Sequence, residues 1–325
     1  MSKIPFVGLH AHSVAGSIFD GLGYPGEHMD FAYENGMDAL ALTDHGNMNG
    51  LSWQVLHAKK MHADGKDFKP IYGCEAYFIP SIEGWREEYE RVMQDKKAAR
   101  AAKKDKTSGA TVEDEELSKK ATRNILNRRR HLVLLAQNQK GLNNLFKLIS
   151  ESYRSENFYR YPRIDFDLLE KYGEGIIASS ACLGGVYAGC YWEHREDGEQ
   201  AVLRSMRTIT ERFVSILGDR WYGELQWNNI PEQHELNKYI IQVCKEFGVD
   251  LISTADSHYP NPDAWKDREL YKRLGWLGKG RSSWGNDGEL PVDVDEIGYE
   301  LYPKNGDQMW QSYKKYSEQA GVKYS

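Results

Sequence analysis

Seven short runs of apolar and β-branched residues recur along the chain and are typical of buried strands. In order they are "VGLHAHS" (7–13), "DALALTDH" (38–45), "PIYGCEAYFI" (70–79), "HLVLLAQ" (131–137), "GIIASSAC" (175–182), "WYGELQW" (221–227) and "LISTADSH" (251–258). Most are followed by a segment of helical length, and in residues 141–154 and 230–248 apolar positions recur every three or four residues. This alternation predicts a parallel sheet covered by helices, and seven repeats favour closure into a barrel.

Helix-end signals accompany two of these segments. Pro25 stands early in "YPGEHMDFAYENG", at a position that helices tolerate, and Gly36 follows where the helix would stop. Pro231 similarly opens the segment that runs to residue 248. We therefore expect helices to begin near Pro25 and Pro231.

One segment breaks the alternation. Residues 83–130 are dominated by charged side chains, with Thr107–Ser108–Gly109 as a predicted turn. We expect two solvated helices around this flexible tip, inserted between the third and fourth strands. The arginines that end the segment (Arg128, Arg129 and Arg130) could hold phosphates or belong to a solvated face beside a functional site, and the charge pattern favours the second interpretation.

The composition limits the class of protein. With 325 residues, of which 40% are hydrophobic and 28% charged, the chain is typical of a globular protein with one large α/β domain or two smaller ones. Its net charge of −6 argues against a protein that coats nucleic acid, so such a contact would need a local basic patch. We find no run of 18 apolar residues and no secretory signal in "MSKIPFVGLHAHS", so we expect a cytoplasmic protein without a membrane span.

The cysteines and several histidines are assigned structural roles. The cysteines show no CxxC spacing, which predicts thiols rather than a disulfide framework. Cys74, Cys190 and Cys244 are expected to be small buried side chains. Five histidines lie in helix-like or loop segments and are expected to be surface or hydrogen-bonded polar residues: His28, His57, His62, His194 and His234.

Side chains that can bind metal ions gather at or beside the ends of the predicted strands. His10 and His12 are two residues apart, so a strand directs both imidazoles to one face. The others are Asp20, Asp44, His45, Glu75, His131, Cys182, Asp256 and His258. In parallel α/β folds, functional side chains collect where the carboxyl ends of the strands meet. His131 is the exception, because it opens its strand.

The mixture of donor atoms indicates which ions would fit. Imidazole, carboxylate and thiolate together suit Zn²⁺, Mn²⁺ or Fe²⁺ better than Mg²⁺, which prefers oxygen ligands. A single tetrahedral zinc uses about four ligands, so the larger number here predicts two or three divalent ions. Paired ions are the usual device for hydrolysis of phosphate esters.

Several long motifs resemble one known family in their order and spacing. They are "HAHS…FDG", "ALTDHGNM", "KPIYGCEAYF", "HLVLLAQNQKGLNNLFKLIS", "YRYPRIDFDLL", "GIIASSACLGG", "GELQWNNIPEQ" and "LISTADSHY". The resemblance is to the polymerase and histidinol phosphatase (PHP) domain, in the version found at the N-terminus of the bacterial replicative DNA polymerase III alpha subunit. It extends over nearly the whole chain except the charged insertion.

This resemblance implies a distorted seven-stranded (β/α) barrel that holds a trinuclear metal centre. The positions that match the family's ligands are His10, His12, Asp20, His45, Glu75, His131, Cys182, Asp256 and His258. Asp44 would then orient a neighbouring ligand without binding metal itself. Some family members have lost several ligands, whereas every matched position here carries a residue able to bind a metal ion.

The resemblance also implies an activity, which is metal-dependent 3′–5′ exonuclease action on DNA of the proofreading type. Asp20, Asp256 and His258 are predicted to be catalytic, and Arg163 is predicted to contact a substrate phosphate. The expected partners are a single-stranded 3′ end of DNA and a polymerase body or other replisome subunits. We expect the domain to span residues 1–280. Residues 281–325 resemble a connection towards a polymerase palm, and no polymerase active site is expected in this chain.

Two other functions stay open at this point. The chain could be a metal-dependent phosphatase of a small phosphomonoester such as histidinol phosphate. It could instead be a non-catalytic scaffold that docks onto a polymerase or partner, since bound metal also contributes to folding free energy. The aromatic segment "SENFYRYPRIDF" could stack the bases of a single strand or form a packed lid, and we favour packing.

Overall fold

The computed structural model describes residues 3–104, 127–277 and 296–324. Its helices are α1 (Pro25–Glu34), α2 (Leu51–Ala63), α3 (Ile82–Lys104), α5 (Gln139–Ser152), α6 (Phe166–Tyr172), α7 (Val186–His194), α8 (Glu199–Leu217), α9 (Pro231–Phe247), α10 (Trp265–Leu277) and α11 (Gly306–Gln319). Its strands are β1 (Ala39–Leu42), β2 (Lys69–Phe78), β3 (Arg130–Ala136), β4 (Phe158–Tyr159), β5 (Tyr161–Ile164), β6 (Ile176–Ser179), β7 (Trp221–Leu225) and β8 (Leu251–Ser253).

The strands form one curled sheet in the order β4-β5-β2-β3-β6-β7-β8, and β1 pairs with β2 off this path. The first apolar run closes the curl. Gly8 bridges Leu40 of β1, and Ala11 bridges Ser257 just beyond β8. The backbone N–H of His12 donates to the carbonyl of Ser257 at 2.7 Å. The structure is therefore a distorted barrel in which the first predicted strand lies between β1 and the end of β8.

One strand of the barrel runs against the others. β3 is antiparallel to both of its neighbours, β2 and β6, whereas the pairs β1–β2, β6–β7 and β7–β8 are parallel. The prediction of an all-parallel sheet is wrong at this strand. The chain leaves β2 and returns to β3 at the same end of the sheet, so β3 must run back along β2. As a result β3 begins at the edge where the other barrel strands end.

Local sequence signals set the ends of the helices. Pro231 occupies the first turn of α9, and the helix ends at Gly248, whose φ of 65° is in the left-handed region. The side chain of Asn138 caps α5 by accepting a hydrogen bond from the backbone N–H of Gly141. The helices that were expected near Pro25 and Pro231 are confirmed.

The main apolar core lies between the outer face of the sheet and helices α5 to α9. It includes Cys74 and Phe78 of β2 and Leu132 and Leu134 of β3, all of which are buried. Because successive side chains of a strand point to opposite faces, Glu75 points the other way, into the barrel. Burial of the outer face thus places a carboxylate inside.

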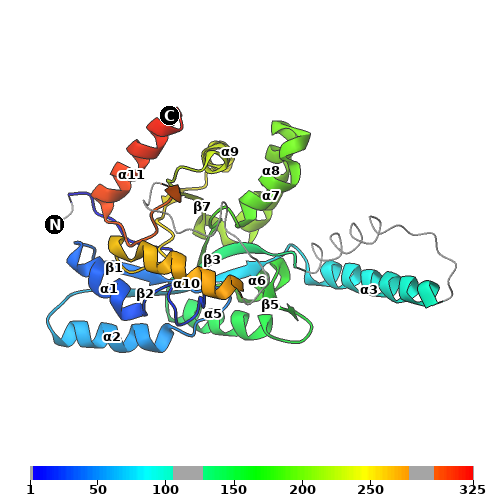
Figure 1. Ribbon diagram of the computed structural model, residues 1–325, viewed down its shortest axis with the longest axis horizontal. Coiled ribbons are helices and arrows are strands. Elements are labelled where there is room, and N and C mark those ends of the chain that lie inside the picture. The colour runs from blue at the N-terminus through cyan, green and yellow to red at the C-terminus, as the bar shows by residue number, and fades with distance from the viewer. Residues whose placement is uncertain (1–2, 105–126, 278–295, 325) are drawn as a thin grey trace.

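Helix α3 projects from the body of the molecule and carries the first part of the charged insertion (Figure 1). Most of its described side chains are exposed, so one solvated helix is confirmed. The second predicted helix and the turn at Thr107–Ser108–Gly109 lie outside the described residues. The aromatic segment after α5 forms the β4–β5 hairpin, where Tyr159 packs against Tyr89 of α3 and Phe158 is exposed.

The chain returns to the barrel after α10. The carbonyl of Leu301 accepts a hydrogen bond from the backbone N–H of His258 at 2.7 Å. The Asn305 side chain, at the start of α11, donates to the carbonyl of Asn35 at 2.9 Å. The segment around Leu301 therefore packs against the loop that follows β8 and stabilises it. The predicted division between a domain and a C-terminal extension stays a prediction.

The cysteines are free thiols, and Cys74, Cys190 and Cys244 are buried as predicted. In the three ranges that the structure describes, no helix is both long enough and apolar enough to cross a lipid bilayer.

Candidate metal centre

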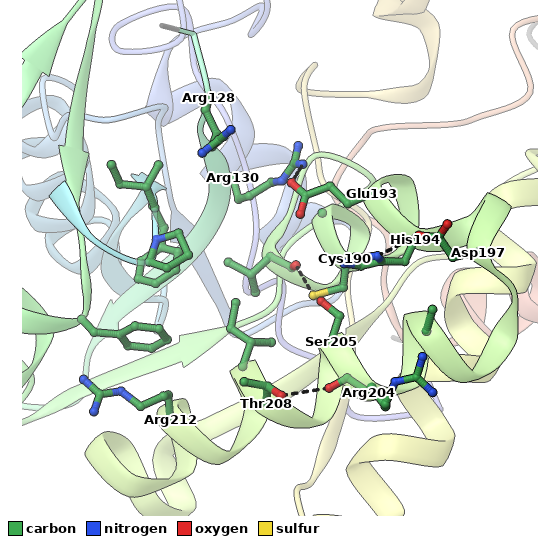
Figure 2. Close-up of a pocket in the computed structure, with 18 residues that line it drawn as sticks. Arg128, Arg130, Cys190, Glu193, His194, Asp197, Arg204, Ser205, Thr208 and Arg212 are labelled. Carbon is green, nitrogen blue, oxygen red and sulfur yellow. Dashed lines mark hydrogen bonds and ion pairs between the residues drawn. The ribbon is translucent and has the colours of Figure 1, made fainter. Parts of the chain in front are cut away.

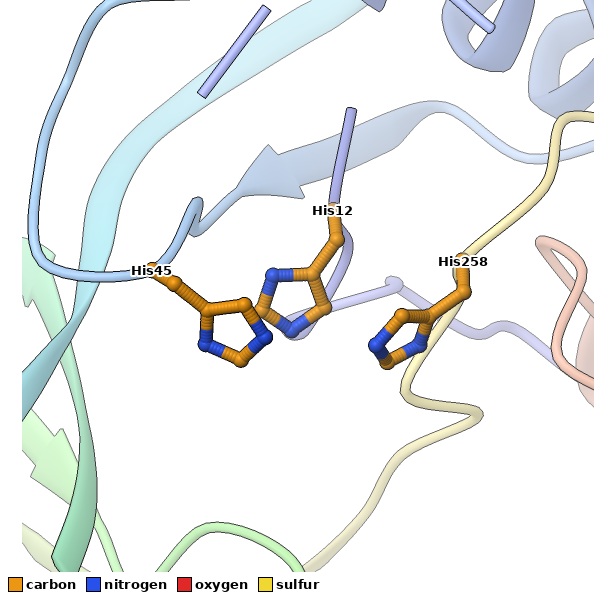
Figure 3. A group of neighbouring side chains, drawn as sticks. All are labelled: His12, His45 and His258. Atoms are coloured by element: carbon orange, nitrogen blue, oxygen red, sulfur yellow. The ribbon is translucent and has the colours of Figure 1, made fainter. Parts of the chain in front are cut away.

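Side chains from widely separated parts of the chain converge at the end of the barrel where β3 begins and the other strands finish. Three overlapping groups have possible ligand atoms within 4.8 Å of one another, and they are His12, His45 and His258; His10, His12 and Asp256; and His45, Glu75 and His131. Figure 3 shows the first group, with the imidazole of His12 between those of His45 and His258. The ring centroids of His12 lie 4.2 Å from His45 and 4.4 Å from His258.

Glu75 lies at the centre of the cluster and is fully buried. One carboxylate oxygen is 3.2 Å from Nε2 of His10 and 3.1 Å from Nδ1 of His131. The other is 2.6 Å from Nδ1 of His45 and 3.6 Å from Nε2 of His12. A single carboxylate thus faces four imidazoles.

Asp20 and Cys182 complete the cluster at its edges. Asp20 Oδ2 lies 3.2 Å from Nε2 of His45 and 3.7 Å from Nε2 of His258, and its side chain is 41% exposed. The sulfur of Cys182 lies 3.6 Å from Nδ1 of His131. The structure therefore brings every predicted ligand into one contiguous group, with Asp20 on the side open to solvent.

Acceptors outside the cluster orient two of the imidazoles. Nδ1 of His10 lies 2.8 Å from a carboxylate oxygen of Glu224, so this nitrogen carries the proton. The hydroxyl of Ser17 donates to Asp44 at 2.8 Å and therefore accepts from Nδ1 of His12 at 3.2 Å. In the neutral form that binds metal, Nε2 of both rings therefore directs its lone pair into the cluster. Asp44 acts on His12 through Ser17 and lies outside the cluster.

The ring of His258 has the same orientation. Its Nδ1 lies 2.7 Å from the backbone carbonyl of Asp256, which can only accept a hydrogen bond. Nε2 of His258 therefore also presents a lone pair towards Asp20. Asp256 has a φ of 47°, in a region that residues other than glycine rarely occupy. Such backbone strain is typical of functional sites. Here it directs the Asp256 side chain into the cluster, which ordinary strand geometry would not do.

The donor atoms of this cluster fit metal ions. Among the described residues, several buried side-chain atoms have no hydrogen bond of normal geometry, and the following five converge here: Nε2 of His10, Nε2 of His12, Nδ1 of His45, Oε2 of Glu75 and Oδ1 of Asp256. Their imidazole nitrogens and carboxylate oxygens face one another at 2.6 to 3.6 Å. Buried polar atoms are costly when they are unsatisfied, and proteins rarely leave them so. Cations placed between these lone pairs would satisfy them together.

Mutual electrostatics keeps the carboxylates ionised. Burial would raise the pKa of Glu75, but the imidazoles of His131, His45 and His10 outweigh burial and hold it well below its usual range. For His45, burial opposes protonation, yet Glu75 and Asp20 outweigh it and raise the pKa to about 10. The acid groups are therefore ionised, as metal ligands must be, whereas the same charges favour the protonated form of His45, which must lose its proton to bind a cation.

Cys182 behaves differently in the same surroundings. Burial, followed by the nearby charges of Glu75 and Asp256, raises the pKa of its thiol well above the usual value. The thiolate form is the one that binds metal, so a cation would be needed to stabilise it here. Unlike the carboxylates, this thiol thus depends on an ion for its ligating form.

Two functional residues were missed by sequence reasoning. Glu224 is buried within β7, accepts from Ser179 at 2.5 Å and orients His10. A charged residue inside an apolar strand is itself a signal, because such side chains are rarely buried without a partner. Arg268 of α10 contacts Oδ1 of Asp20 at 2.6 Å, and no pattern in the sequence links these two positions.

Arg163 is not a phosphate contact, which corrects the prediction. Its side chain is completely buried and donates to the carbonyls of Arg128, Tyr159 and Tyr161 at 2.9 to 3.0 Å. The guanidinium also packs on Trp85, 4.4 Å from the ring centroid. A residue that joins the base of the insertion to the β4–β5 hairpin cannot reach a substrate.

The remaining histidines make ordinary structural contacts. Nε2 of His28 lies 2.8 Å from the carbonyl of Leu22, and Nε2 of His62 lies 2.8 Å from that of Phe68. The other three are paired with nearby polar groups: His57 with Asp30, His194 with Asp197, and His234 with Tyr324 and the carbonyl of Asn228. Their predicted structural role is confirmed.

Replacement of Glu224 by glutamine is expected to weaken metal binding about tenfold, because groups that orient a ligating histidine typically contribute 10- to 100-fold in affinity. The change removes the charge beside His10 while keeping the shape of the side chain. Competition with a chromophoric chelator measures this affinity. Glu193→Gln, at the surface partner of Arg130, is the matched control. Equal affinities in both variants would contradict the orienting role of Glu224.

The family model of the PHP domain matches residues 8–228. The DNA polymerase III alpha subunit of Aquifex aeolicus (strain VF5) is 39% identical over 263 residues, which cover 81% of this chain and 19% of that protein. That of Borreliella burgdorferi is 35% identical over 257 residues, covering 79% and 18%. The chain spans about a fifth of the length of these curated relatives.

Two solved structures are similar at low sequence identity. An amidohydrolase from Chromobacterium violaceum, solved with sulfate and no metal, has a TM-score of 0.40 and 14% identity, covering 82% of this chain and 96% of that one. Histidinol phosphate phosphatase from Lactococcus lactis, solved with zinc, L-histidinol and phosphate, has a TM-score of 0.35 and 14% identity, covering 85% and 94%.

Proposed function

Because the chain belongs to the PHP domain family, whose model matches residues 8–228, we propose that it is a metal-dependent phosphoesterase. Within that class we propose a 3′–5′ exonuclease that acts on a single-stranded 3′ end of DNA. The similarity to DNA polymerase III alpha subunits supports a nucleic acid substrate and a replisome as the setting. A cytoplasmic location stays a prediction.

One observation carries this proposal. Five buried polar atoms from four parts of the barrel each lie 2.6 to 3.6 Å from another of the five, yet they form no hydrogen bond of normal geometry among the described residues. Three imidazole nitrogens here crowd against two carboxylate oxygens, whereas a merely structural polar cluster would form regular hydrogen bonds. The set combines imidazole nitrogens with carboxylates, and the thiol of Cys182 lies at its edge. This donor set suits Zn²⁺, Mn²⁺ or Fe²⁺, and two or three ions are proposed.

The chain's own residues would hold the ions and orient the substrate. His10, His12, Asp20, His45, Glu75, His131, Cys182, Asp256 and His258 are the proposed ligands. Divalent ions in such a cluster neutralise charge on a phosphoryl group and make water nucleophilic near neutral pH. Asp20, whose side chain is 41% exposed, borders the open side, and His258 lies 3.7 Å from it, so Asp20 is the group best placed to hold or move a proton at the leaving oxygen. Arg268 keeps Asp20 in that position.

The test is hydrolysis of a 5′-labelled single-stranded oligonucleotide by the protein loaded with Mn²⁺ or Zn²⁺, beside an assay of histidinol phosphate. We expect a ladder of products shortened from the 3′ end and little release of phosphate from the small ester. Asp256→Asn should lower the nuclease rate about 100-fold or more, because it removes charge from the cluster.

Other outcomes would assign a different function. Turnover of only the small ester would contradict the nuclease and favour a phosphatase. A protein with its full metal content and no turnover of either substrate would favour the scaffold. An unchanged nuclease rate in Asp256→Asn would show that the activity does not arise at this cluster.

A further inference from the structure

Three consecutive arginines, Arg128 to Arg130, lead into β3, and their side chains lie on different sides of the sheet. Arg128 and Arg130 lie on the outer side of the barrel, whereas Arg129 shares the side of His131. Alternation along an extended chain accounts for this division. The sequence left open whether these arginines bind phosphate or cover a solvated face, and the structure gives different answers for different positions.

The outer two arginines are neutralised by acidic partners. Arg128 pairs with Glu88 of α3 at 3.0 Å, and Arg130 pairs with Glu193 of α7 at 2.6 Å. Both line a pocket of about 950 Å³ on the outer face of the sheet, beside α7 and α8 (Figure 2). Their charges are engaged in holding the insertion and α7 against the barrel.

Arg129 has no such acidic partner within the described part of the chain. Its guanidinium carbon lies 3.7 Å from the ring centroid of Tyr161 and 5.3 Å from that of Tyr77. Its one hydrogen bond there is a long one of 3.3 Å to the carbonyl of Asn127, and its Nε is buried without a partner. A guanidinium that is stacked on an aromatic ring directs its N–H groups outward in its own plane. There they can donate hydrogen bonds to a planar or tetrahedral anion.

Tyr77 connects this cation to the metal centre. It follows Glu75 by two residues on β2, so both side chains point to the same face. Its ring centroid lies 5.6 Å from that of His131 and 6.2 Å from that of His45, to which it is stacked within 9°. The ring of Tyr77 therefore contacts both Arg129 and two proposed ligands, so Arg129 lies at the edge of the cluster.

We infer that Arg129, stacked on Tyr161 beside Tyr77, forms a subsite for the phosphodiester backbone of a single strand whose 3′ end lies in the metal centre. The inference rests on the proposed function in taking the strand as the substrate. Arg129 binds the phosphate on the 5′ side of the scissile one, and its stacking on Tyr161 holds the guanidinium in position. A small phosphomonoester has no second phosphate, so this subsite selects polynucleotides over such esters.

Arg129→Gln tests the subsite, with Arg128→Gln as the matched control because Arg128 faces the outer pocket. The metal-loaded proteins are titrated into a labelled single strand whose 3′-terminal linkage is a methylphosphonate, which resists hydrolysis. We expect Arg129→Gln to weaken binding about tenfold. The plot of log affinity against log salt concentration should become shallower by about 0.7, the value for one phosphate contact on a single strand.

Arg129→Lys should keep the slope of the parent but bind more weakly than the parent, because lysine cannot stack as a planar fork. The ratio of kcat/KM for an oligonucleotide to that for histidinol phosphate should fall about tenfold in Arg129→Gln.

The possible results separate this inference from the proposed function. If the parent protein binds the strand with the expected variant effects but hydrolyses nothing, the subsite stands and the nuclease proposal fails. If the parent hydrolyses DNA and both glutamine variants bind alike with the same salt slope, the nuclease stands and the subsite is overturned. A loss of binding in Arg129→Gln without a change in salt slope would show a structural role and would also overturn it.

Discussion

Replacement of Glu75 by glutamine is expected to abolish hydrolysis, with a fall in kcat/KM of at least about 1,000-fold. This corresponds to about 4 kcal/mol of lost transition-state stabilisation, which is within the several kcal/mol that metal ions supply to phosphoryl transfer. The carboxylate faces His10, His12, His45 and His131 from the centre of the cluster. A neutral amide there removes the negative charge that would bind cations together with these rings. The measurements are steady-state kinetics and the metal content of the purified variant.

The control is Glu88→Gln, which neutralises the glutamate of α3 that pairs with Arg128 and is not one of the proposed ligands. This variant should retain the metal content and rate of the parent. Full metal content and activity in Glu75→Gln would show that the cluster is not the catalytic centre. Full metal content without activity would locate the role of Glu75 in the reaction rather than in holding the ions.

The sequence was sufficient wherever a ligand followed from local geometry. His10 and His12 are two residues apart, and extended backbone directs such a pair to one side. Asp256 and His258 have the same spacing, but the left-handed backbone of Asp256 means that alternation alone does not place that pair. Glu75 follows from the same alternation on β2, because burial of Cys74 against the helices turns its neighbour inward. The ends of parallel strands then bring these local groups together.

The sequence was insufficient where the outcome depended on strand direction or on distant partners. His131 opens its strand, and only the antiparallel course of β3 brings it to the edge where the other ligands lie. Arg163 looked available for a phosphate, yet three carbonyls from the insertion and the β4–β5 hairpin enclose it. Arg129 and Arg130 are neighbours of one type, and only the tertiary contacts separate a stacked cation from an ion-paired one.

Removal of bound metal is expected to lower the melting temperature of the protein by about 10 °C or more. An ion present at 1,000 times its dissociation constant stabilises the folded state by about 4 kcal/mol, and two or more ions add to this. In a chain of this size each kcal/mol corresponds to about 2 °C. The destabilisation arises at the end of the barrel where the ligands converge, because Nε2 of His10 and His12 and Oδ1 of Asp256 lie buried together there without hydrogen bonds of normal geometry. Thermal unfolding before and after dialysis against a chelator measures the shift.

The return of metal makes this result specific. Zn²⁺ or Mn²⁺ added back after the chelator is removed should restore the melting temperature of the parent protein. The same addition should not stabilise Glu75→Gln, because that variant lacks the carboxylate shared among the imidazoles. A melting temperature that is unaffected by the chelator, in a protein shown to have lost its metal, would contradict the view that these buried donor atoms need cations. Recovery of Glu75→Gln to the same extent as the parent would instead place the stabilising ions elsewhere in the chain. Since folding of the barrel brings these donors together, stability and metal content should rise and fall together.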